Sequence, residues 1–162
     1  MIATVQAEER KIREQPIEYG VFIDPRDGTV SAAFTDGKPN YISLPNALIP
    51  GLQDKIFTHN HPSGNSLSKD DVLSAQRFNM LAIRSVSPGG TNYMLRRTDT
   101  SWPDNFQSTI VDIEQRQYTE WKMAISTGAM DVLTASATHF DTLWQKVEKA
   151  FPGEIVYTRD QR

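Results

Sequence analysis

The sequence predicts an α/β fold: a mixed, mainly antiparallel sheet flanked by helices, with a C-terminal helical hairpin. Short segments of alternating apolar and polar residues, separated by Pro- and Gly-containing turns, fill most of the first hundred residues. After Trp102, apolar residues recur at helical spacing. We therefore expect a first domain over 1–101, with its characteristic motifs at 17–98, and a helical extension over 102–162.

In the first domain, residues 3–14 are rich in Ala, Glu, Gln, Lys and Arg and predict a charged surface helix. The strands that alternation predicts lie at 17–24, 29–35, 41–44, 55–61 and 91–97. The first two would form a hairpin across the turn at 25–28. Apolar residues at helical spacing predict a helix over 68–84.

In the extension, apolar residues predict helices over 104–127 and 130–151 and a short strand at 154–158. The second helix carries an a/d heptad stripe, made of Met130, Leu133, Ala137, Phe140, Trp144, Val147 and Phe151. Such a stripe usually packs on the neighbouring helix. A homodimer interface or a docking helix for a partner is the alternative, which exposed tryptophans would favour.

Two of the three histidines stand one residue apart at the end of a predicted strand. Residues i and i+2 of a strand point to the same face, so His59 and His61 can converge on one metal ion. Asp71 follows in the first turn of a helix. Two histidines and one carboxylate are a ligand set of catalytic zinc, with the fourth position left to water. The alternative is an exposed His-x-His pair that binds nothing.

Ser68 and Asp71 also have the spacing of a capping box, in which Ser68 caps the helix and Asp71 answers from its first turn. Capping does not exclude ligation, because a fixed helix start can aim Asp71 at a metal. Asp70 is an alternative ligand, although its use would break the Ser-x-x-Asp relation.

The run from Thr58 to Gly64 reads Thr-His-Asn-His-Pro-Ser-Gly, and Ser68-x-x-Asp71 follows it. This string resembles the signature of the JAB/MPN (JAMM) zinc metalloprotease family, and its wording resembles most the bacterial RadC-like branch. The resemblance covers roughly residues 17–98. It implies the JAB/MPN-like, cytidine-deaminase-like sandwich for that part of the chain.

The resemblance also implies roles. His59, His61 and Asp71 would ligate Zn²⁺ together with a water, and Glu18 would be the general base. Ser68 would hydrogen-bond the oxyanion or position the water. The implied reaction is hydrolysis of a peptide or isopeptide bond. The implied partner is a peptide or protein substrate, including an isopeptide-linked modifier.

Glu18 has an alternative interpretation as an exposed strand carboxylate. Glu8, Glu9 and Glu14 are weaker candidates for the base, because they lie in the predicted charged helix.

Departures from the family pattern leave two other functions open. The loop between His61 and Asp71 is one residue shorter than is usual in the family, which favours a non-catalytic scaffold or binding module. Residues 85–90 lack the Asp-His pair that the RadC-like branch has at this place. A DNA-associated role is therefore weakly supported. Nothing in 17–98 corresponds to the long insertions with which eukaryotic relatives grip ubiquitin.

Charge and composition narrow the other partners. Lys and Arg total 17 and Asp and Glu total 20, so the net charge is −3, which argues against general nucleic-acid binding. The absence of cysteine excludes disulfides, Cys-ligated metal sites and thiol catalysis. The first residues are polar, and no apolar run is long enough to cross a bilayer. We expect a cytoplasmic protein without a membrane partner.

Overall fold

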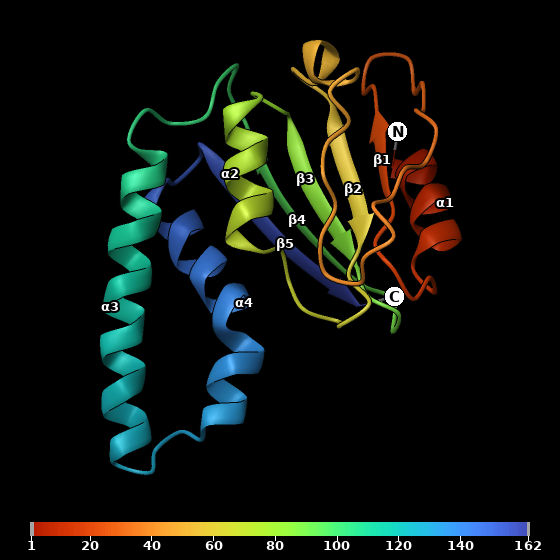
Figure 1. Cartoon of the computed structure of the whole chain (residues 1–162). Coiled ribbons are helices and arrows are strands. Elements are labelled where there is room, and N and C mark those ends of the chain that lie inside the picture. Colours follow the sequence, from red (N-terminus) through yellow and green to blue (C-terminus); the bar gives the residue numbers. More distant parts are fainter. Residues whose placement is uncertain (1, 162) are drawn as a thin grey trace.

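The computed structural model describes residues 2–161 and has a five-stranded mixed sheet as its centre (Figure 1). The strand order is β1-β2-β3-β4-β5; β2 and β3 run parallel, and the other three pairings are antiparallel. The strands are β1 (Gly20–Ile23), β2 (Ile56–Asn60), β3 (Ala82–Val86), β4 (Thr91–Arg97) and β5 (Ile155–Gln161). The predicted α/β class with a mixed, mainly antiparallel sheet is confirmed.

Alternate residues of β1 and β2 divide between two cores, as the two-residue period of a strand requires. Ile23 and Ile56 face a small core that α1 (Ile2–Ile12) covers through Val5. Phe22 and Phe57 face the large core on the other side of the sheet. That large core also takes in α2 (Lys69–Arg77), α3 (Phe106–Ser126) and α4 (Val132–Ala150).

Helix α1 confirms the N-terminal helix, but one of its acidic residues is not on the surface. Glu9 is buried and accepts hydrogen bonds from Thr58 Oγ1 at 3.0 Å and from Arg84 Nε at 2.7 Å. This ion pair attaches α1 to the sheet. Arg84 of β3 is thereby engaged inside the fold.

Two of the predicted strands are wrong. Residues 29–35 contribute only isolated bridges, through Val30 and Phe34 to β1, and residues 41–44 form no strand. The apolar residues that produced the alternation instead pack on the large core from a covering loop, as Phe34 and Ile42 do. Apolar alternation reports burial on one side, and a loop lying on a core satisfies it as well as a strand does.

The predicted helix over 68–84 is also wrong in its second half. Helix α2 ends at Arg77, Asn79 takes a left-handed conformation with φ 48°, and the chain then enters β3. Asn tolerates this conformation better than most residues, so it marks the turn. The run that follows Asn79 is almost wholly apolar. A short apolar run does not distinguish a helix end from a central strand.

The C-terminal segment forms the predicted helical pair α3–α4 and ends in β5. Strand β5 pairs with β4 over its whole length, and Trp102, Phe106 and Trp144 are buried in the large core. The stripe on α4 is buried only from Trp144 to Phe151, whereas Leu133 is 82% exposed. Residues before 101 and residues after 102 therefore both contribute to the sheet and to its large core.

Among residues 2–161, no helix combines the length and the apolar character that crossing a membrane would need.

Candidate metal centre

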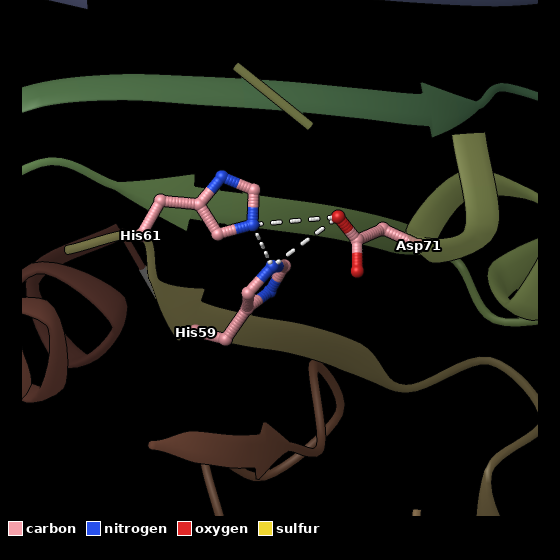
Figure 2. A group of neighbouring side chains, drawn as sticks. All are labelled: His59, His61 and Asp71. Atoms are coloured by element: carbon pink, nitrogen blue, oxygen red, sulfur yellow. Dashed lines mark hydrogen bonds and ion pairs between the residues drawn. The ribbon is translucent and has the colours of Figure 1, made fainter. Parts of the chain in front are cut away.

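Three side chains converge where β2 ends and α2 begins (Figure 2). The Nε2 atoms of His59 and His61 lie 2.8 Å apart. Asp71 Oδ2 lies 3.5 Å from His59 Nε2 and 3.4 Å from His61 Nε2. All three donor atoms thus point at one small volume, and this group could hold a metal ion. Asp70 is exposed and does not belong to the group.

The donor geometry fits a small tetrahedral ion. Zinc–nitrogen bonds of 2.0–2.1 Å place tetrahedral ligand atoms about 3.3 Å from one another. The two separations to Asp71 Oδ2 are close to this value. The separation between the imidazole nitrogens is shorter, so binding requires the rings to move apart by about 0.5 Å. Three donor atoms leave one of the four tetrahedral positions for a further ligand.

Local structure explains why the ligands meet. His59 lies in β2, and the chain continues extended for one residue, because His61 N donates to Val86 O of β3. Asp71 is held by the predicted capping box, which is confirmed: Ser68 Oγ and N donate to Asp71 Oδ2 at 2.7 and 2.8 Å. These two hydrogen bonds restrict where the Asp71 carboxylate can point.

Hydrogen bonds from the surrounding chain orient the ligands. His61 Nδ1 donates to the Asn65 carbonyl at 2.9 Å, which leaves Nε2 free to ligate. Asn60, between the two histidines, accepts from Tyr19 N and donates to the carbonyls of Gln15 and Ile17. Asn60 therefore holds the segment that carries Glu18 against the end of β2.

Glu18 is buried next to the group, just before β1 begins. Its Oε1 lies 3.9 Å from His61 Nε2. Burial raises the pKa of Glu18 from 4.5 to about 7, although the charge of His61 lowers it, and the Asp71 carboxylate raises it further. The interpretation of Glu18 as an exposed strand carboxylate is wrong.

The ligand side chains influence one another. Burial raises the pKa of Asp71, but the charges and hydrogen bonds of His59 and His61 outweigh it and hold that pKa well below 3.8. Burial lowers the pKa of His59 from 6.5. Burial also lowers the pKa of His61, but hydrogen bonding to Asp71 and its charge outweigh this and raise it. A charged carboxylate beside a neutral imidazole is the donor set that a divalent cation requires.

The C-terminal segment holds the loop that joins His61 to Asp71. The Trp144 indole donates to the Leu67 carbonyl at 2.8 Å, and both side chains are fully buried. Ser66 Oγ lies 2.9 Å from Tyr157 Oη, which in turn donates to Asp141 at 2.7 Å. These hydrogen bonds connect the loop between His61 and Asp71 to α4 and to β5.

A further contact ties the start of α2 to α3. Lys69 Nζ donates to Glu114 Oε2 at 2.6 Å, and Glu114 Oε1 lies 3.2 Å from His139 Nε2. His139 is thus a buried, hydrogen-bonded histidine, and it does not belong to the group that converges. These contacts show how a short loop can still deliver Asp71.

Sequence reasoning missed the residues that support the ligands. Asn60 stands inside the His-x-His motif, which is a signal for a structural role, but its partners lie in a segment 41 to 45 residues away. Trp144 is 77 residues from its carbonyl partner, and Tyr157 is 91 residues from Ser66. No local sequence pattern predicts contacts between residues so far apart in the chain.

The chain matches no protein-family model, and no curated protein matches it significantly.

Proposed function

We propose that this protein is a zinc-dependent metallopeptidase or isopeptidase of the JAB/MPN type, which hydrolyses a peptide or isopeptide bond. The observation that carries the proposal is the convergence of His59, His61 and Asp71 with a second, buried carboxylate beside them. A ligand set alone serves structural zinc as well. Hydrolysis also needs a general base that does not itself bind the metal, and the carboxyl group of Glu18 can serve as one.

In this proposal His59, His61 and Asp71 hold the zinc ion. Bound zinc would polarise the scissile carbonyl and make water acidic enough to lose a proton near pH 7. Glu18 takes that proton from the attacking water and later donates it to the leaving amine nitrogen. Burial, which raises the pKa of Glu18 in the metal-free protein, favours its holding the proton that it takes up.

Ser68 acts in this proposal by positioning Asp71. Its hydroxyl donates to Asp71 Oδ2 and accepts from Asp71 N at 3.2 Å, so both capacities are in use. These bonds favour an orienting role for Ser68 over direct contact with the oxyanion.

Two measurements test the proposal together. Protein purified without chelator or a histidine tag should contain about one zinc ion per chain by plasma mass spectrometry. The zinc-loaded protein should cleave members of a set of peptides and Lys-linked isopeptides. Glu18→Gln should keep the zinc and lose at least about 100-fold in turnover, because general acid–base catalysis contributes about that much.

Glu14→Gln is the matched control, because Glu14 is an exposed carboxylate four positions upstream, paired with Arg13. It should retain full turnover. Full activity in Glu18→Gln would show that the base is assigned wrongly. A zinc-loaded wild type that cleaves no member of the set would favour the scaffold function instead.

A further inference from the structure

A cavity of about 780 Å³ opens between α3 and α4, at the side of the helical pair that faces the metal-binding loop. Its walls are mainly apolar: Trp121 and Ile125 come from α3, and Val132 and Phe140 come from α4. This volume is in the range of ligand sites and can take one large side chain with room to spare.

The apolar side chains of the cavity wall are exposed to water, which is energetically unfavourable. Val132 is 63% exposed and Tyr118, which also lines the cavity, is 56% exposed. Trp121 is only half-buried, although Trp102 and Trp144 are fully within the core. Apolar surface gathered in a concavity is typical of a binding site, because an apolar occupant would remove it from water.

The loop of the metal centre forms one wall of this cavity. Asn65 and Ser66 line it, and the Asn65 carbonyl is the acceptor for Nδ1 of the metal ligand His61. Asn65 therefore belongs both to the cavity wall and to the immediate surroundings of the His61 ring.

The wall between the cavity and the metal centre carries an amide group, which can hydrogen-bond to a polypeptide main chain. The side chain of Asn65 is exposed, and its amide has no hydrogen-bond partner within residues 2–161. An amide can donate to and accept from a peptide group. A free amide between an apolar cavity and a metal centre matches a main chain that carries an apolar side chain, and it offers little to a purely apolar lipid chain.

We propose that this cavity binds a large apolar side chain, aromatic or aliphatic, of the polypeptide whose main chain crosses the metal centre. This inference rests on the proposed hydrolytic function for the identity of the site beside it. It names the substrate class: a peptide or isopeptide with a bulky apolar residue close to the scissile bond.

The test measures binding without turnover. The full chain carrying Glu18→Gln, loaded with zinc, is titrated with two capped alanine peptides, one with a central Phe and one with a central Ala. The signal is the NMR shift of the Trp121 indole N–H. The Phe peptide should bind about tenfold more tightly, because that is the smallest gain expected from burying a large apolar side chain.

Two neighbouring substitutions localise the effect. Val132→Asp places a charge at the cavity wall and should abolish the preference for Phe. Leu133→Asp is the matched control, since Leu133 is more exposed, stands in the same first turn of α4 and does not line the cavity. It should leave the preference unchanged.

Equal binding of the two peptides would overturn the proposal, and so would an equal loss in both Asp variants. Light scattering gives a third outcome: a wild-type dimer that Val132→Asp turns into a monomer would assign the cavity to a second copy of the chain and overturn the proposal as well.

Failure of the hydrolytic function looks different. If the Phe preference holds while the zinc-loaded wild type cleaves neither peptide nor any isopeptide, the cavity is a polypeptide-binding site without the proposed chemistry. If the wild type cleaves both peptides equally and Val132→Asp changes nothing, hydrolysis stands and the cavity assignment fails.

Discussion

Two regions depart in opposite ways from the usual pattern of apolar residues inside and polar residues outside: the end of β2 and the far end of the α3–α4 pair. At the end of β2, polar groups are buried: His59 is 0% and Glu18 is 6% exposed. At the far end of the helical pair, apolar groups are exposed, with Met123 at 65% and Leu133 at 82%. Figure 1 shows the lower ends of α3 and α4 projecting beyond the sheet.

The two inversions have different energetic consequences. Burying an ionisable group is costly unless partners compensate it, and the metal centre supplies those partners among its own residues. The exposed apolar residues have no such compensation within residues 2–161, so their cost is small per residue and persists until a partner covers them. A buried polar cluster thus predicts chemistry, whereas an exposed apolar surface predicts binding.

The largest effect should come from removing a ligand in the polar region. Asp71→Asn should lower zinc affinity at least about a thousandfold, which is about 4 kcal/mol of binding free energy. Ser68 still caps α2, and the Asn side-chain oxygen can still accept from Ser68 N, so the fold should persist. Asp70→Asn is the control and should bind zinc as the wild type does, because Asp70 is exposed and outside the group. Competition with a chromophoric chelator measures both; equal losses would contradict the ligand assignment.

The next effect concerns Glu18 in the metal-free protein. Its folded pKa of about 7 exceeds 4.5, so the folded state holds the proton more tightly, and the free energy of unfolding falls as pH rises from 4.5 through 7. Glu18→Gln removes this loss. It should stabilise the metal-free protein by up to about 3 kcal/mol at pH 8 and by nothing below pH 4.5.

Urea unfolding of both proteins in the presence of chelator, at pH 4.5, 6 and 8, measures this difference. A constant difference across that range would show that Glu18 does not titrate near pH 7 in the folded state. The result matters for the comparison, because it measures what the buried carboxyl costs the fold when no metal is bound.

A slightly smaller effect should follow from releasing the metal-binding loop. Trp144→Phe keeps an aromatic ring in the core but leaves the Leu67 carbonyl buried and unpaired. It should cost about 2 kcal/mol of unfolding free energy and weaken zinc binding about tenfold. Trp121→Phe, at the half-buried Trp of the cavity, should change neither by a comparable amount. Unchanged zinc affinity in Trp144→Phe would show that α4 does not position the loop.

The smallest effect is expected in the apolar region. Leu133→Asp and Val132→Asp should each change the unfolding free energy by less than about 0.5 kcal/mol, since both side chains are exposed. An acidic residue in the first turn of a helix is mildly favourable. Thermal unfolding of the two variants checks this. A loss of several kcal/mol in either would mean that this surface is already covered, by a second copy or by another part of the chain.

Much of the metal centre was predictable because its signals are local. The two-residue spacing of His59 and His61 places both rings on one side of the chain in any extended segment. The spacing of Ser68 and Asp71 specifies the start of α2 through a capping box that needs no distant partner. The helices α3 and α4 follow in the same way from apolar residues at helical spacing.

Local signals failed where two structures satisfy the same pattern. The apolar run that became β3 continues the period of α2, and the apolar residues of the covering loop alternate like those of a strand. Burial decides between these alternatives, and burial depends on the residues that arrive from elsewhere in the chain. Leu133 and Ala137 of the a/d stripe stay exposed for the same reason: the core on the sheet reaches Trp144 but not Leu133.

The His-x-His pair and the helix that presents Asp71 were thus determined by the amino-acid sequence, because neighbours in the chain specify them. The position of Glu18 beside His61, the anchoring of Leu67 by Trp144 and the cavity next to Asn65 were decided by the tertiary structure alone. Each of these joins segments that lie dozens of residues apart. Only the packing of the sheet and its helices brings such segments within reach, because hydrogen bonds and burial act over a few ångströms, whatever the separation along the chain.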